Sequence, residues 1–103
     1  MSVVVVATIT PKPQSRDEVL AALLETIPAV HREPGCELYA LQEGKDRFVM
    51  IEQWASGEAL AVHGQADALV KLGAALDGKL AEPTDVQVLR PHPAGDPTRG
   101  AVR

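Results

Sequence analysis

The residues of this sequence that are best suited to chemistry lie between Glu33 and His63. This stretch contains the only cysteine, tyrosine, phenylalanine and tryptophan of the chain, which are Cys36, Tyr39, Phe48 and Trp54. Flat, partly polar rings gathered in one region suit a pocket for a planar ligand, although a hydrophobic core uses such rings in the same way.

His63 is the candidate general base. It follows Trp54 closely in the sequence, so both side chains are expected to face the same space. An imidazole can take a proton from a phenol or hydroquinone and leave an electron-rich anion that meets oxygen. The alternative is a structural histidine that hydrogen-bonds a backbone carbonyl near the helix end at Gly64.

Glu52 is a carboxylate that the pattern places on a buried face. In a regular strand it shares that face with Met50 and Trp54, because side chains alternate between the two faces. A buried carboxylate is costly unless it is paired. We therefore expect a structural ion pair with Arg47 or Arg90, or a hydrogen bond from a backbone amide.

The composition argues against several kinds of site and partner. The formal net charge is −4 and the sequence has no run of Lys or Arg, so we expect no nucleic-acid partner. Cys36 has no second thiol and no neighbouring pattern that marks a thiolate, so we interpret it as a small buried hydrophobe. The three histidines lack the spacing of metal ligands, and we expect no metal site.

Nothing in the sequence suggests a membrane. The longest apolar runs fall far short of the ~20 residues that a membrane span needs. Residues 1–7 lack the basic flank and the length of a signal peptide. We therefore expect a cytoplasmic protein.

The first half of the chain predicts a strand and a helix. Residues 3–9 are mostly β-branched and predict a strand that is buried on both faces. Ser15 and Glu18 fit a capping box, followed by an apolar stripe at helical spacing that includes Leu24. Pro28 lacks the N–H that would bond the carbonyl of Leu24, so we expect a kink or an early end there.

The second half predicts a hairpin over residues 36–42 and 47–54, two helices over residues 56–64 and 69–80, and a last strand over residues 84–90. Ser56 is the expected N-cap of the first of these helices, and Pro83 follows the second. In the last strand Val86 and Val88 share one face.

This order of elements is that of the ferredoxin-like split βαβ fold, an α+β architecture whose four-stranded antiparallel sheet carries helices on one face. The first and third strands are apolar on both faces, so the second face also needs a cover. We expect another copy of the same sheet there, in a two-fold homodimer. The domain is expected to span residues 1–91, and the Pro- and Gly-rich residues 92–103 to form a flexible or partner-contacting tail.

The chain resembles the antibiotic biosynthesis monooxygenase family, the dimeric α+β barrel proteins that include small quinol monooxygenases. The residues that carry the resemblance are Glu33-Pro34-Gly35-Cys36, Tyr39, the strand over residues 48–54, Leu60 and His63. The resemblance implies a homodimeric enzyme that uses no cofactor. It would oxidise a quinol, a phenol or a polyketide-like aromatic with molecular oxygen, in a pocket between sheet and helices.

The resemblance also implies the residues of the site. His63 would be catalytic at the mouth or wall of the pocket, and Tyr39 would offer its phenolic hydroxyl. The substrate-binding residues would be Trp54, Phe48, Met50 and Thr8. The chain departs from the family pattern in two ways: it contains no Asn, and Ala66, Asp67 and Ala68 stand where members often have a small residue, Pro and a second His.

Two other functions compete with oxygenation. A dimeric barrel that binds a small apolar molecule or another protein without chemistry would have a pocket with no perturbed titratable group. A haem-binding or haem-degrading relative would use His63 as axial ligand and place Trp54 against the porphyrin. The missing Asn and the few aromatic residues argue against haem.

Overall fold

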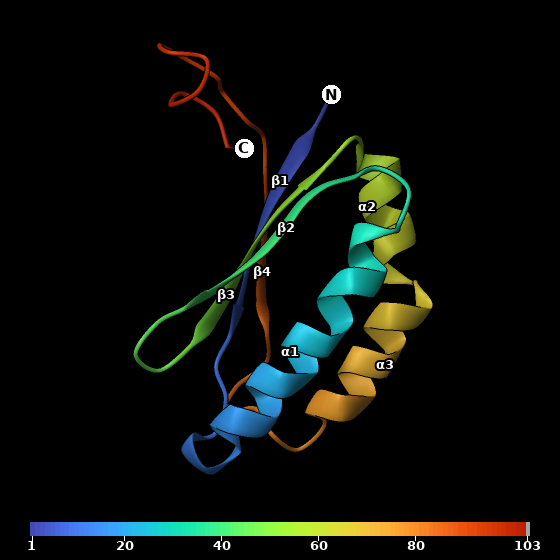
Figure 1. Ribbon diagram of the computed structural model, residues 1–103, viewed down its shortest axis with the longest axis vertical. Coiled ribbons are helices and arrows are strands. Elements are labelled where there is room, and N and C mark those ends of the chain that lie inside the picture. The colour runs from blue at the N-terminus through green and yellow to red at the C-terminus, as the bar shows by residue number, and fades with distance from the viewer. Residues whose placement is uncertain (103) are drawn as a thin grey trace.

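The computed structural model describes residues 1–102. Within them, four antiparallel strands form one sheet in the order β2-β3-β1-β4, and helices α1, α2 and α3 cover one face of it (Figure 1). In chain order the elements are β1 (Val3–Ile9), the short 3-10 helix η1 (Pro13–Ser15), α1 (Arg16–His31), β2 (Cys36–Glu43), β3 (Phe48–Trp54), α2 (Gly57–Gly64), α3 (Asp67–Leu76) and β4 (Asp85–Leu89). The predicted α+β, ferredoxin-like split βαβ fold is confirmed.

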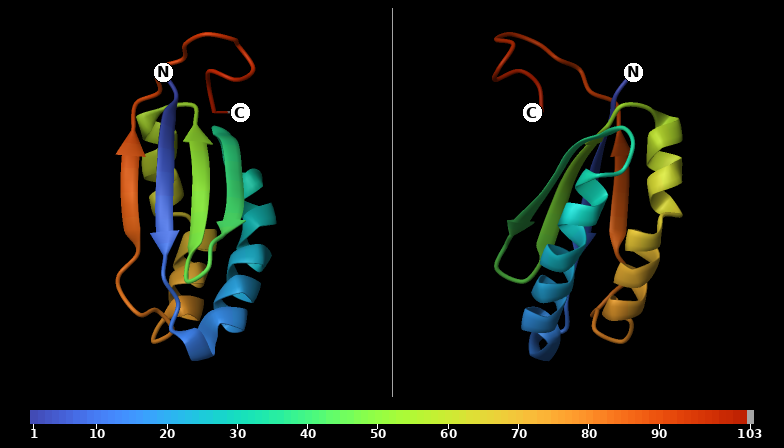
Figure 2. Two further views of the ribbon diagram at one scale, coloured as in Figure 1. Left: turned by 90° about the vertical axis from the view of Figure 1, so that its left-hand side faces the viewer. Right: turned by 45° about the vertical axis from the view of Figure 1, so that its right-hand side comes forward.

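The two central strands fix which side chains face the helices. β1 and β3 pair from Val3 opposite Trp54 to Ile9 opposite Phe48. β4 pairs with β1, and β2 pairs with β3 through an irregularity near Cys36. Figure 2 shows all three helices on one side of the sheet and no helix on the other. Alternate residues of each strand therefore point either into the helix layer or onto the open face.

The hydrophobic core lies between the sheet and the helices. Its almost fully buried large side chains are Trp54, Phe48, Leu23, Met50, Val5, Val19 and Val30. The strand members among them alternate along β1 and β3, and the helix members follow the 3.6-residue period of α1. Leu24 does not join this stripe as predicted, because 54% of it is exposed on the far side of α1.

Helix α1 departs from the predicted helix at both ends. The 3-10 helix η1 runs directly into α1, so Ser15 has φ −107° and ψ 4° and its side chain makes no capping hydrogen bond. The predicted capping box is therefore wrong. Of the kink or early end predicted at Pro28, the early end is wrong, since α1 continues to His31. Pro28 lies on the exposed side of the helix, where water can bond the carbonyl that the ring leaves unpaired.

The two shorter helices are bounded by a cap and a glycine. The hydroxyl oxygen of Ser56 accepts a hydrogen bond from the backbone N–H of Ala59 at 3.1 Å, which confirms the predicted N-cap of α2. α3 ends at Leu76, earlier than predicted. Gly78 follows with φ +75°, a left-handed conformation in which a helix does not continue.

Strand β4 forms an uncovered edge of the sheet. Val86 and Val88 pair with Ala7 and Val5 and so lie on the helix side, as the alternation predicts. They are nevertheless 54% and 58% exposed, because β4 extends beyond the helix layer. The space beneath this edge therefore opens to the outside.

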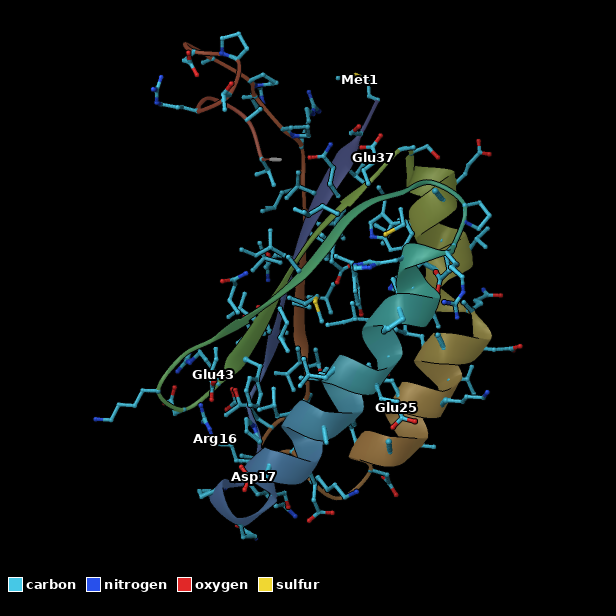
Figure 3. All side chains as sticks on the ribbon, viewed as in Figure 1. Met1, Arg16, Asp17, Glu25, Glu37 and Glu43 are labelled. Carbon is cyan, nitrogen blue, oxygen red and sulfur yellow. The ribbon has the colours of Figure 1, made fainter. Side chains whose placement is uncertain are left out.

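Arg16 ties the start of α1 to the β2–β3 turn (Figure 3). Its guanidinium lies 2.8 Å from the Glu43 carboxylate and donates to the carbonyls of Gly44 and Lys45 at 2.7 and 3.0 Å. The same group lies 4.9 Å from the centroid of the Phe48 ring. These contacts fix the hairpin, and with it one end of β3, against α1.

The segment after β4 forms no helix or strand over residues 90–102. It folds back on itself, because Ala94 N–H donates to the carbonyl of Gly100 and the Asp96 carboxylate accepts from the backbone N–H groups of Thr98 and Arg99. Arg103, the last residue of the predicted tail, lies outside the described residues. Among residues 1–102, no helix has the length and apolar character that crossing a membrane requires.

Candidate functional site

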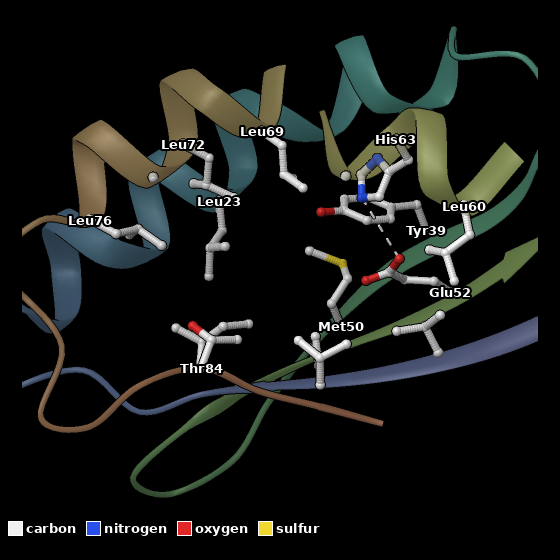
Figure 4. A pocket seen from close by; sticks show the side chains of 16 residues that line it. Leu23, Tyr39, Met50, Glu52, Leu60, His63, Leu69, Leu72, Leu76 and Thr84 are labelled. Carbon is white, nitrogen blue, oxygen red and sulfur yellow. Dashed lines mark ion pairs between the residues drawn. The ribbon is translucent and has the colours of Figure 1, made fainter. Parts of the chain in front are cut away.

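A cavity of about 370 Å³ lies between the sheet and the helices (Figure 4). Four of its lining residues have polar side chains, namely Tyr39, Glu52, His63 and Thr84. The other walls are aliphatic side chains, Met50 and glycines. An apolar cavity of this size with a few converging polar groups is typical of small-molecule sites.

The polar groups divide the cavity into a deep end and a mouth. Tyr39, Glu52 and His63 are 6%, 5% and 4% exposed, and they lie together at the deep end. Thr84 and Val86 are exposed lining residues on the β4 side, and Figure 4 shows Thr84 at the opposite end from His63. A ligand that enters beside β4 would therefore direct one end toward the three buried polar groups.

His63 lies between two carboxylates. Its Nδ1 is 2.8 Å from Oε1 of Glu33, a hydrogen bond, and its Nε2 is 3.9 Å from Oε1 of Glu52, which is too far for one. Nδ1 is thus occupied by a partner outside the cavity lining, whereas Nε2 faces Glu52 at the cavity wall. The imidazole therefore has Nδ1 hydrogen-bonded to Glu33 and Nε2 within reach of a ligand in the cavity.

Trp54 contacts both His63 and Glu52 and does not line the cavity. Its indole N–H donates to Oε1 of Glu52 at 2.9 Å, and its ring stacks on the imidazole of His63 with centroids 4.4 Å apart. Tyr39 meets the imidazole edge-on at 5.5 Å between centroids. The ring contacts hold His63 in one orientation, and the hydrogen bond does the same for the Glu52 carboxylate.

The backbone near Gly35 brings Glu33 to His63. Gly35 has φ +81°, its carbonyl accepts from Ala55 N–H at 2.8 Å, and a Cβ built on it would lie 2.6 Å from the Cβ of Ala59. The α1–β2 loop is thus pressed against α2, the helix that carries His63. Only glycine permits both this conformation and this close approach.

Burial changes the pKa values of Glu52 and Tyr39, the two other polar groups at the deep end. It raises the pKa of Glu52 above its ordinary value, although the Trp54 N–H and the neighbouring His63 act in the opposite direction. Burial, together with the charges of Glu52 and Glu33, raises the pKa of Tyr39 far above its ordinary value. Tyr39 therefore remains a phenol near neutral pH, a hydrogen-bond donor rather than a base.

The structure places only some of the predicted site residues at the cavity. His63, Tyr39 and Met50 line it, and Trp54 lies behind Glu52 and His63. Phe48 and Thr8 are not lining residues.

Both exceptions follow from the sheet. Phe48 is at the other end of β3, under the guanidinium of Arg16. Thr8 alternates with Ala7 and Ile9, which line the cavity, and therefore points to the open face.

The sequence does not predict that the carboxylates of Glu33 and Glu52 both lie beside His63. Glu52 is paired with Trp54 and His63, so the expected partners Arg47 and Arg90 are wrong; Arg47 instead pairs with Asp46. The backbone carbonyl considered as a partner of His63 is wrong too, because Nδ1 bonds Glu33. The signal available for Glu33 was the Pro34-Gly35 turn that follows it.

Other chemistry near the site is limited. Burial and the charge of Glu33 raise the pKa of the Cys36 thiol, which disfavours a thiolate. Within residues 1–102, no group of three His, Cys, Asp or Glu side chains is arranged to hold a metal ion.

Comparison with known proteins gives consistent results. The sequence profile of the family described as antibiotic biosynthesis monooxygenase matches residues 2–73. No functionally curated protein matches the chain.

Solved structures show the same fold. Rv0793 from Mycobacterium tuberculosis is 28% identical, with a TM-score of 0.86 over 93% of this chain and 100% of that one. A Caulobacter crescentus protein named after the same family is 30% identical, with a TM-score of 0.80 over 85% of this chain and 87% of that one. PA3566 from Pseudomonas aeruginosa, at 24% identity and a TM-score of 0.79 over 85% of this chain and 91% of that one, shares the fold.

Proposed function

Because the chain belongs to the antibiotic biosynthesis monooxygenase family, we propose that it is a cofactor-independent monooxygenase of phenolic or quinol-type aromatic substrates. His63 is the base, Tyr39 and Glu52 orient the substrate, and Met50 contributes to the apolar wall.

The observation that carries the proposal is the gap between His63 and Glu52. Nε2 and Oε1 are 3.9 Å apart at the cavity wall. One substrate hydroxyl can bridge them when Glu52 is protonated, the form that its burial favours, because the hydroxyl then donates to Nε2 and accepts from the Glu52 O–H, with its oxygen about 2.8 Å from each atom. In that position the hydroxyl proton points at Nε2, and the aromatic body extends into the apolar space.

The reaction balances without an external reductant. His63 takes the hydroxyl proton, and the resulting anion gives electrons to O₂ as a carbon–oxygen bond forms on the ring. Cleavage of the O–O bond then leaves one oxygen atom as a carbonyl and releases the other as water. The substrate loses two hydrogens and gains one oxygen, so a phenol becomes a quinone and a hydroquinone becomes a hydroxyquinone.

An oxygen-uptake assay tests the proposal. A panel of mono-, bi- and tricyclic phenols and hydroquinones is incubated with the protein in air and under argon. We expect oxygen-dependent turnover of at least one member, with one atom of ¹⁸O₂ in the product. His63→Ala should lower kcat roughly 10²-fold or more, the usual contribution of a general base.

His92→Ala is the matched control, because His92 lies in the exposed segment after β4. It should retain the wild-type rate. Turnover that is unaffected by His63→Ala would remove His63 from the mechanism, and a panel without any oxygen uptake would reject the proposed activity.

Ligand binding without chemistry is the second candidate, and the mainly apolar lining favours it. In that case an apolar aromatic binds wild type and His63→Ala with similar affinity and is recovered unchanged. The perturbed pKa values of Glu52 and Tyr39 support catalysis over plain binding, since perturbed groups gather where chemistry occurs.

We further propose that two copies pack sheet to sheet. The open face presents alternate residues of all four strands, among them Val6, Ile51, Ala40 and Leu89. The same face also carries Thr8, Gln42, Gln53, Gln87 and Asp85, and its apolar residues are stabilised when a second sheet covers them at about 10 Å. Since helices cover only the other face, a second copy of the chain is the partner of matching shape.

Light scattering after size exclusion tests the dimer. Wild type should have twice the chain mass of 10.9 kDa. Ile51→Glu, at the centre of the open face between Val6 and Ala40, should be monomeric. Leu24→Glu changes an exposed residue of α1 and should leave the dimer intact. A monomeric wild type would contradict the proposal.

A further inference from the structure

Glu33 is a buried carboxylate for which the proposed reaction has no step. Its Oε1 bonds His63 Nδ1 at 2.8 Å, and the two side chains are 13% and 5% exposed. Its second oxygen, Oε2, is buried and has no hydrogen-bond partner among the described residues. Glu33 does not line the cavity, so it does not meet a ligand there.

A purely structural role explains this arrangement poorly. A buried acceptor without a partner costs stability, and native structures leave few such groups. A smaller or apolar side chain at this position would avoid the cost. Within residues 1–102, the contact with His63 is the only hydrogen bond or ion pair that the Glu33 side chain makes in return.

We infer that Glu33 is a positioning residue that fixes the tautomer of His63. A carboxylate can only accept a hydrogen bond, so Nδ1 must carry the hydrogen in the 2.8 Å contact. The neutral imidazole then has its lone pair on Nε2, the nitrogen that faces Glu52 and the cavity. Once Nε2 has taken a proton, the negative charge of Glu33 stabilises the imidazolium. The inference deepens the proposed role of His63 as base and rests on it for its catalytic consequence.

The backbone on both sides of Glu33 holds its carboxylate in place beside His63. Glu33 N–H donates to the carbonyl of Val30 at 3.0 Å, and Cys36 N–H donates to the carbonyl of Glu33 at 3.2 Å. With Gly35 packed against Ala59, the carboxylate is held from both sides of its loop. The opposite tautomer would place a lone pair of Nδ1 against the carboxylate, which is repulsive.

Nitrogen-15 NMR of histidine-labelled protein tests the tautomer without any substrate. In wild type at mildly alkaline pH, His63 should be protonated at Nδ1 and bare at Nε2. His31 is the internal control with the reverse pattern, because its Nε2 lies 3.0 Å from the carbonyl of Tyr39, which can only accept. Glu33→Ala should return His63 to the Nε2–H form that free imidazole side chains prefer.

Kinetics on the substrate found by the oxygen-uptake panel test the consequence. Glu33→Gln keeps the size of the side chain and removes its charge. It should lower kcat roughly 10–100-fold while KM stays within about threefold, as expected when a base is misdirected but the cavity is unchanged. Glu25→Gln, on the exposed side of α1, is the matched control and should behave as wild type.

Each outcome decides one question. His63 protonated at Nε2 in wild type, or an unchanged tautomer in Glu33→Ala, would overturn the inference whatever the activity. Loss of turnover in His63→Ala with full kcat in Glu33→Gln overturns the inference and leaves the proposed function standing. Full turnover in His63→Ala overturns the role of the base itself.

Discussion

The indole of Trp54 contacts both His63 and Glu52, the two groups proposed to hold the substrate hydroxyl. Its ring stacks on His63 with centroids 4.4 Å apart and planes inclined by 30°, and its N–H donates to Glu52 Oε1 at 2.9 Å. Trp54 is fully buried. It therefore keeps the imidazole and the carboxylate at a set separation without occupying the cavity between them.

Trp54→Phe should loosen this pair. The change keeps an aromatic ring but removes the N–H that holds the pKa of Glu52 down, so that pKa should rise further. Loss of a buried donor should also lower the free energy of unfolding by roughly 1–3 kcal/mol. Carbon-13 NMR titration of the glutamate carboxyls and urea unfolding measure the two effects. A Glu52 pKa that falls would contradict the assigned hydrogen bond.

Glu52→Gln should change how stability depends on pH. The pKa of Glu52 is raised in the folded protein above its ordinary value of 4.5, so the folded state binds this proton more tightly than the unfolded chain. Its stabilising contribution is complete below that ordinary value and is lost as pH rises through the folded pKa. Gln cannot titrate, so the unfolding free energy of wild type should fall relative to the variant over this window. Urea unfolding across the pH range measures it, and a constant difference would refute it.

Gly35→Ala should destabilise the protein by roughly 1–3 kcal/mol, because alanine is strained at positive φ. The φ of Gly35 is +81°, and a Cβ added there would lie 2.6 Å from the Cβ of Ala59. Adding Ala59→Gly to Gly35→Ala should restore the stability lost through the Cβ contact. The stability lost through backbone strain should remain lost. Thermal or urea unfolding of the four proteins separates the terms. Additive effects would mean that the two residues do not touch.

Gly73 is an exposed lining residue of α3 where a Cβ would meet no atom within 4 Å. Gly73→Ala should therefore raise the unfolding free energy by about 0.5–1 kcal/mol, the helix preference of alanine over glycine. Gly73→Leu should fill space at this wall and raise KM, or the dissociation constant, more for tricyclic than for monocyclic ligands. Equal effects on both would show that ligands do not approach Gly73.

The sequence was sufficient for the architecture because the fold depends on repeated local patterns. The strand over Val3–Ile9 agrees with the prediction to the residue, since prolines follow its β-branched run closely. The hairpin and the Ser56 cap likewise depend on neighbouring residues. Helix α1 was less predictable, because η1 took the place that an N-cap at Ser15 requires.

The site was only partly predictable for a different reason. The nearness of Trp54 and His63 follows from a strand leading into a short helix. The contact from Glu33 to His63 instead depends on a loop that α2 packs against, and the Pro34-Gly35 turn indicates the loop but not which residue it contacts. The prediction that Thr8 lies at the cavity is wrong, because Thr8 and Ala7 point to opposite faces of the sheet. The sequence does not state which of these faces the helices cover.

The pairing of β1 with β4 has a consequence for how the chain is made. Val4 lies opposite Leu89, so the N-terminal strand of the sheet gains its second neighbour only from residues near the other end of the domain. During synthesis β1 must wait for β4 to leave the ribosome, with one backbone edge unpaired. Contacts of such long sequence separation slow folding and expose strand edges to wrong partners. The sheet is therefore expected to close after translation of the domain rather than during it.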